Sequence, residues 1–159
     1  MTNAVLVTDT GFGNDDWSGE FSALSEGVAA NARAVDVASS DDASALRNHL
    51  DTVQLIRIDF PSFADGRGFT LARQLRQMGY TGRLRARGHV LADQYAMARR
   101  SGFDEVEIDE TLAARQPEDQ WRFRADWRAH DYQARLRALA TLPLTQIKAY
   151  QEEAGVNRA

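Results

Sequence analysis

The segment 59–68 (DFPSFADGRG) contains the residue types that best suit the binding of a small anion. It follows an expected strand and precedes an expected helix, and ligand sites in α/β sheets collect at such carboxyl ends of strands. Gly66 and Gly68 flank Arg67, so backbone N–H groups there can approach a ligand without a Cβ in the way. The guanidinium of Arg67 and the helix start favour an oxyanion such as sulfite, sulfate, phosphate or a carboxylate. The alternative is structural: Asp65 closes a turn and Arg67 pairs with a carboxylate.

A histidine occupies a second junction of the same kind, because His89 follows the expected strand 82–87. Neighbouring parallel strands end at the same edge of a sheet, so His89 is expected close to the carboxylates of segment 59–68. A histidine beside carboxylates can serve as a general acid, a general base or a metal ligand; the alternative is a histidine that only starts a helix. The candidate catalytic residues are therefore Asp59, Asp65, His89 and Asp93.

Several chemistries are excluded because the sequence lacks the residues they need. The 159 residues include no cysteine, which removes disulfides, thiolate nucleophiles and cysteine-held metal clusters. The P-loop, the G-x-G-x-x-G fingerprint and the G-x-S-x-G serine motif are also missing. His49 and His130 lie on other expected helices and do not have metal-ligand spacing. We therefore predict no metal, and no motif identifies a cofactor.

The composition predicts a soluble, cytoplasmic protein. Hydrophobic residues make up 43% of the chain, yet no apolar run approaches the ~20 residues of a membrane-spanning helix, and no secretory signal is evident. The net charge of −4 argues against nucleic-acid binding. Aromatic residues and arginines alternate between Trp121 and Tyr132, and we interpret the aromatics as core anchors or as part of a homodimer interface.

Expected strands and helices alternate along the chain, which is typical of parallel α/β sheets. Strands are expected at 4–8, 34–37, 53–60, 82–87 and 104–109, with a loop at 9–18. Helices are expected from the N-cap Ser40 and the acidic first turn Asp41-Asp42 through Leu46 and Leu50, at 69–78, at 90–101, from Pro117 to about 140, and from Pro143 to Glu153. The fold prediction is a single α/β domain over 1–159. It has a small parallel sheet of βα units, half-barrel-like or flavodoxin-like, in 1–116 and C-terminal helices in 117–159.

The three central strands alternate between apolar and charged residues, unlike strands buried on both faces, which read as continuous apolar runs. One face carries Ile56, Ile58, Phe60, Leu84, Ala86, Val106 and Ile108. The other carries Arg57, Asp59, Arg83, Arg85, Arg87, Glu105, Glu107 and Asp109. If these strands are neighbours in chain order, ion pairs form between them. The charged face is then either a solvated or helix-covered surface, or a polar pocket or interface.

Many residues between 57 and 107 occur in the same order as in the sequences of a known protein family. The matching residues are Asp59-Phe60-Pro61, Phe63, Asp65-Gly66-Arg67-Gly68, Ala72-Arg73, Leu75-Arg76, Gly79-Tyr80, Gly82, Leu84-Arg85-Ala86, Gly88, Val90-Leu91, Asp93-Gln94 and Gly102-Phe103-Asp104. With them the chain resembles the DUF934 family, bacterial proteins of unknown function. Two departures are His89, where the family commonly has aspartate, and Ser101, where it commonly has cysteine.

The resemblance implies an association with assimilatory sulfite reduction, where family members often carry the label oxidoreductase. We therefore expect an accessory or small-oxyanion-binding protein of that process, with sulfite reductase or another sulfur-assimilation protein as partner. The alternatives are an oxidoreductase of sulfite reduction and a structural interaction module without catalysis. The candidate ligand-binding residues are Gly66, Arg67, Gly68, Arg85 and Gln94.

Overall fold

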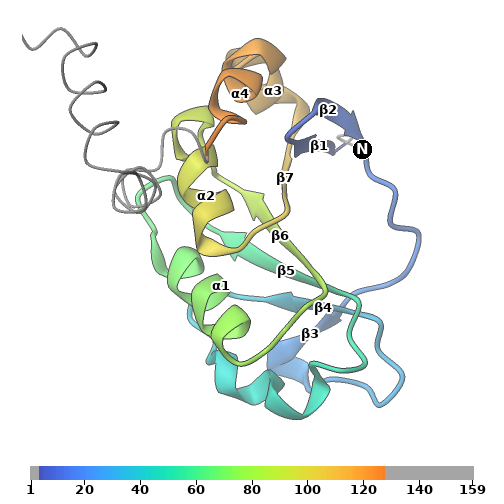
Figure 1. Ribbon diagram of the computed structural model, residues 1–159. Helices are drawn as coiled ribbons and strands as arrows, with labels where there is room; N and C mark the ends of the chain where they lie inside the picture. The colour runs from blue at the N-terminus through green and yellow to red at the C-terminus, as the bar shows by residue number, and fades with distance from the viewer. Residues whose placement is uncertain (1–3, 128–159) are drawn as a thin grey trace, which may run out of the picture. The chain divides into compact units, whose positions relative to one another are not determined.

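The computed structural model describes residues 4–127, whose strands form one mixed sheet (Figure 1). The chain divides into two compact units, Met1–Asp126 and Trp127–Ala159, and the sheet belongs to the first. The strand order is β2-β1-β7-β6-β5-β4-β3. The strands are β1 (Val5–Thr8), β2 (Gly11–Asn14), β3 (Ser22–Ala23), β4 (Ala34–Val37), β5 (Leu55–Phe60), β6 (Arg83–Gly88) and β7 (Glu105–Ile108).

The strands from β3 to β7 are parallel and lie side by side in chain order. The register places Arg57 beside Arg85, and Arg85 beside Glu105. The predicted α/β class and the parallel adjacency of the three central strands are therefore confirmed. A flavodoxin-like sheet would reverse its strand order at one point, and this series does not, so its order is that of a half barrel.

The hairpin of β1 and β2 forms the other end of the sheet and was not expected. β1 is antiparallel to both β7 and β2. The prediction of a loop over 9–18 is wrong for Gly11–Asn14, which form β2. Gly11 has a φ of 115°, a left-handed conformation that favours glycine at this tight reversal. The N–H of Phe12 donates to Glu118 Oε2 at 2.7 Å, so a residue far along the chain helps to hold the strand.

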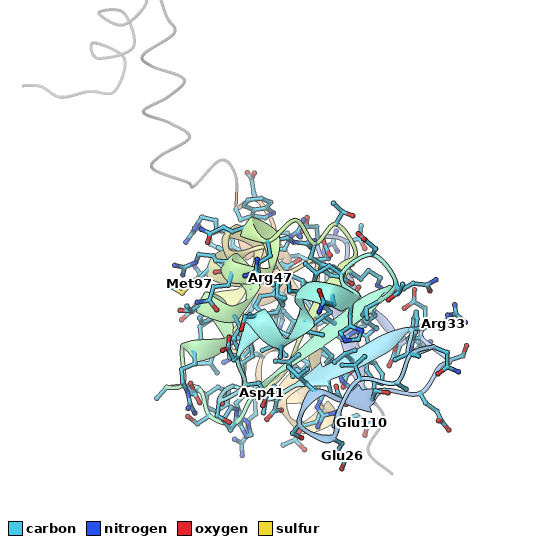
Figure 2. All side chains as sticks on the ribbon, turned by 90° about the horizontal axis from the view of Figure 1, so that it is seen from below. Glu26, Arg33, Asp41, Arg47, Met97 and Glu110 are labelled. Atoms are coloured by element: carbon cyan, nitrogen blue, oxygen red, sulfur yellow. The ribbon has the colours of Figure 1, made fainter. Side chains whose placement is uncertain are left out.

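Two α-helices cover the apolar face of the sheet, as predicted. These are α1 (Arg67–Gln77) and α2 (Tyr95–Ser101), which lie together on one side of the sheet in Figure 1. Leu71, Leu75 and Tyr95 are buried and pack with the inward-facing strand residues in one core. The outer face of α2 is open to solvent, because Met97 is 46% exposed and projects at the edge of the view in Figure 2.

Two expected helices are shorter or tighter than predicted. The helix expected after Ser40 and through Leu50 is the 3₁₀ helix η2 (Ala43–His49). Its N-cap is Asp42 and not Ser40, because the side chain of Asp42 accepts a hydrogen bond from Ser44 N–H. The expected helix 90–101 begins with the 3₁₀ helix η3 (Ala92–Gln94) before α2. The side chain of Gln94 accepts a hydrogen bond from Leu91 N–H and so fixes this turn. Leu91 itself is only partly buried and does not join the core. A further 3₁₀ helix, η1 (Leu24–Glu26), follows β3.

After β7 the chain forms α3 (Glu110–Arg115), which was not expected, and α4 (Glu118–Arg124). The predicted helix from Pro117 to about 140 ends at Arg124, where Ala125 N–H bonds to Arg122 O and closes the last turn. The helix expected from Pro143 lies outside the described residues. Trp121 is fully buried against Tyr95, at 6.0 Å between ring centroids. Trp121 thus belongs to the core, and the homodimer stays a prediction.

Among residues 4–127, no helix has the length and apolar character needed to cross a membrane.

Arg76 joins the ends of α1 and α2 to the start of β6. Its Nη1 donates to Tyr80 O at 3.0 Å and to Gly82 O at 2.8 Å. Its Nε and Nη2 donate to Gly102 O at 3.0 and 2.8 Å, and Nη2 also contacts Asp104. Gly102 ends α2 in a left-handed conformation, where backbone carbonyls lack partners within the helix. One side chain therefore satisfies carbonyl groups of two connections.

We expect Arg76→Met to lower the free energy of unfolding by about 2–4 kcal/mol, because several part-buried carbonyls lose a charged donor. Urea denaturation followed by circular dichroism measures this loss. Arg73→Met is the matched control, since Arg73 lies exposed on the same helix and should change stability by less than about 0.5 kcal/mol. Equal losses in the two variants would contradict the role given to Arg76.

Candidate functional site

A network of ion pairs centred on Arg85 holds the charged face of the sheet together. Arg85 is fully buried, with Nε 2.6 Å from Glu105 Oε2 and Nη1 2.8 Å from Glu107 Oε1. Arg57 on β5 extends the network, at 3.2 Å from Glu107 and 2.6 Å from Asp36 on β4. Removing one partner of such a buried pair costs about 3–5 kcal/mol, far more than for an exposed pair. Arg85 therefore serves the network and does not face an open ligand site.

The segment 15–21, which we call the cover segment, closes this face on the side of the sheet away from α1 and α2 (Figure 1). Asp15 Oδ1 lies 3.0 Å from Arg85 Nη2, and Asp16 Oδ1 lies 2.8 Å from Arg83 Nη2. The ring of Phe21 packs against the guanidinium of Arg57, with 3.7 Å between Cζ of Arg57 and the ring centroid. Around Arg85 the charged face is thus covered by an extended segment and not by a helix, whereas its end at Asp59 and Arg87 stays partly exposed.

Ion pairing lowers the pKa of both aspartates of the cover segment. Burial alone would raise the pKa of Asp15, but the hydrogen bonds from Arg85 and Trp17 N–H and the charge of Arg85 outweigh it. For Asp16 the hydrogen bond from Arg83 is the largest cause of the lowered pKa. Both carboxylates therefore stabilise the fold above the ordinary aspartate pKa, and this stabilisation is lost as the pH falls through the lower pKa of the folded state.

The loop between β5 and α1 brings Asp65 and Arg67 into contact. Asp65 accepts hydrogen bonds from the N–H of Arg67 at 3.1 Å, from its Nε at 3.0 Å and from its Nη2 at 2.7 Å. These bonds hold the pKa of Asp65 far below its usual range. Nη2 of Arg67 also donates to Ser39. Gly68 is buried where a Cβ would overlap the ring of Phe60, so packing explains this glycine.

The other candidate residues lie in separate places. Asp59 lines a hollow of about 160 Å³ with Arg87, and the two side chains are 3.9 Å apart. Asp93 is mostly exposed and pairs with Arg124 at 2.7 Å. Gln94 donates to the backbone of the β5–α1 loop and so links two loops. The structure does not bring the candidate catalytic residues Asp59, Asp65, His89 and Asp93 together in one cluster.

A cavity of about 440 Å³ lies at the carboxyl ends of β6 and β7, and we call it the arginine cavity. Its charged and polar lining is formed by Arg87, His89, Glu107, Asp109, Thr111 and Arg115. Its apolar lining is formed by Ala4, Phe63, Ile108 and Leu112. Arg87 lines both this cavity and the smaller hollow, so the two lie on either side of it. This is the edge at which ligand sites of parallel sheets are found.

The carboxylates of the arginine cavity are engaged and its arginines are less so. Glu107 is paired within the ion-pair network, and Asp109 caps α3 by accepting from Leu112 N–H at 2.8 Å. Arg87 makes only a long ion pair among the described residues, with 3.9 Å between its Nε and Asp59 Oδ1. Arg115 is exposed and makes no ion pair or side-chain hydrogen bond within residues 4–127. Two guanidinium groups therefore remain available to an anion.

His89 also lines the cavity, and its backbone contacts fix its tautomer. Nδ1 lies 3.1 Å from Phe60 O, and a carbonyl oxygen can only accept, so Nδ1 carries the proton. In the neutral ring Nε2 then has a free lone pair, which is the form needed for a general base. The ring packs edge-on against Phe63, at 5.1 Å between centroids. No group of three or more metal-ligating side chains is found within residues 4–127.

Sequence reasoning missed Arg115 and placed Arg87 only on the charged face. The signal for Arg115 was present, because Asp109 followed by Glu110 is a typical helix start with an acidic first turn. This helix start could be assigned to the edge of the sheet only once it was known that β7 ends at Ile108, one residue before Asp109.

A model of the family described as bacterial protein of unknown function (DUF934) matches residues 34–143, about two thirds of the chain. The chain belongs to the DUF934 family. The match spans β4 through β7, α1 to α4 and both main elements of the arginine cavity. No curated protein and no solved structure matches this DUF934 protein.

Ser101 is buried near the end of α2. Its hydroxyl donates to Met97 O at 2.8 Å, one turn earlier in the helix. The position lies in the helix layer, apart from the lining of the arginine cavity. Ser101 therefore has a packing role in this DUF934 protein.

We expect Asp15→Asn to lower stability by about 1 kcal/mol at pH 7, through the lost ion pair with Arg85. Because the pKa of Asp15 is lowered in the folded state, the difference from wild type should be largest above about pH 5 and shrink below about pH 4. Urea titrations between pH 3 and 7 measure it. Glu20→Gln, an exposed acid of the same segment, is the control, and a pH-independent deficit in Asp15→Asn would argue against the charge interaction.

Proposed function

We propose that this DUF934 protein binds a small oxyanion such as sulfite in the arginine cavity and acts as an accessory protein of assimilatory sulfite reduction. The observation that carries the proposal is the pair Arg87 and Arg115, which face one cavity while its carboxylates are engaged elsewhere. Guanidinium groups bind oxyanions through planar, charge-assisted hydrogen bonds. The sulfur context comes from the family resemblance, which supports the further proposal of a cytoplasmic protein with sulfite reductase or another sulfur-assimilation protein as partner.

The arginine cavity suits this role better than the loop 65–68. In that loop Arg67 already donates two side-chain hydrogen bonds to Asp65, so an incoming anion must compete with a carboxylate two residues away. Arg115 has no such competitor among the described residues. The cavity therefore offers an anion an arginine that no carboxylate of the described residues already occupies, which the loop does not.

An oxidoreductase of sulfite reduction remains the alternative from the resemblance, but no contact favours it over anion binding. None of the carboxylates predicted to act with His89 lines the arginine cavity: Asp65 is engaged by Arg67, Asp93 by Arg124, and Asp59 lines the neighbouring hollow. His89 itself is available as a base at the cavity, so a catalytic role would involve this residue alone among the four candidates.

We expect Arg115→Gln to weaken sulfite binding by roughly ten- to a hundredfold, because one charge-assisted contact contributes about 1.5–3 kcal/mol. Calorimetric titration in deoxygenated buffer measures it, with circular dichroism to confirm folding. Arg67→Ala separates the two sites, since binding in the arginine cavity predicts no effect from this change. Arg73→Gln controls for the loss of one positive charge. Absence of sulfite binding by the wild-type protein, or a loss seen only in Arg67→Ala, would overturn the proposal.

A further inference from the structure

We propose that the ligand of the arginine cavity is an organic oxyanion, in which a sulfonate or phosphate monoester group is joined to a small apolar or aromatic body. This inference rests on the proposed function, because it concerns the same cavity, and it assigns an organic oxyanion as the preferred ligand in place of a bare inorganic ion. It follows from the size of the cavity, from its apolar lining and from the placement of its cations.

The cavity is much larger than a bare oxyanion. Its volume of about 440 Å³ lies within the range of roughly 300–1,000 Å³ found for sites that hold small organic molecules. A sulfite ion occupies on the order of two water volumes, roughly 60 Å³. An inorganic ion would therefore leave most of the cavity filled with water.

The apolar lining provides contacts that an inorganic anion cannot use. Phe63 is 41% exposed, which is unusual for a phenylalanine, and it lines the cavity together with Leu112 and Ile108. Its ring is held edge-on by His89, so the aromatic wall is ordered before a ligand arrives. A ligand body that covers Phe63 removes apolar surface from water and gains affinity from this burial.

The polar part of the cavity selects an oxyanion head group. Arg87 and Arg115 each present a planar fork that matches two oxygens of a sulfonate or phosphate group. Glu107 is neutralised by Arg57 and Arg85 in the ion-pair network, which leaves Asp109 as the one carboxylate of the described lining that opposes the two arginines. The combination of two arginines with an aromatic wall is the chemistry of a site for an amphiphilic anion.

Calorimetric titrations with benzenesulfonate, methanesulfonate and sulfite test the inference. We expect benzenesulfonate to bind at least about tenfold more tightly than sulfite, with methanesulfonate between them, because only the ring covers Phe63. Phe63→Ala should weaken benzenesulfonate binding by about tenfold and change sulfite binding by less than about twofold. Arg115→Gln should weaken both. Phe123→Ala, a matched change of an exposed phenylalanine on α4, should change neither.

The outcomes separate this inference from the proposed function. Sulfite binding that depends on Arg115, with benzenesulfonate no tighter and no effect of Phe63→Ala, would overturn the inference and leave the proposed function standing. Binding of benzenesulfonate without binding of sulfite would support the inference and overturn sulfite as the ligand. Absence of binding by all three probes would overturn both.

Discussion

A fully buried guanidinium must be surrounded by carboxylates, and Arg85 imposes this condition on the whole sheet. Its partners come from β7, through Glu105 and Glu107, and from the cover segment, through Asp15. A slip of β6 by one residue would turn Arg85 toward the apolar core, so the network fixes the register of the parallel strands. The same condition explains why the charged face is closed by an acidic segment and not by a helix.

The position of the cavity follows from the same alternation. Arg87 lies two residues after Arg85 on the same face of β6, but at the end of the strand, where the buried carboxylates no longer surround it. The carboxylate found near it is 3.9 Å away, compared with 2.6 and 2.8 Å for the β7 partners of Arg85. Arg85 and Arg87 occupy equivalent positions in the alternation of β6. They differ in role because Arg85 is inside the network and Arg87 is at its edge.

Local patterns were sufficient to predict the central strands and the two covering helices, because apolar periodicity and the glycines that end α1 and α2 depend on near neighbours. They were not sufficient for β2, whose Gly-Phe-Gly-Asn sequence has low strand propensity and whose Phe12 is held by Glu118 from a distant helix. The ion pairs of Arg85 with β7 were predicted, but its burial was missed for the same reason. Its face was predictable from alternation, whereas its cover by a segment some seventy residues earlier was not.

The contrast between Arg67 and Arg115 shows why a motif with suitable residue types can be a weaker guide than an isolated charge. Asp65 lies two residues before Arg67, so their ion pair forms with little loss of chain entropy and is present whenever the loop is folded. Arg115 stands at the end of a short helix, with no carboxylate among the described residues within ion-pairing distance. An arginine serves an external anion when its own chain does not supply one. By this criterion the proposed anion site lies at the ends of β6 and β7, although the sequence motif for anion binding lies between β5 and α1.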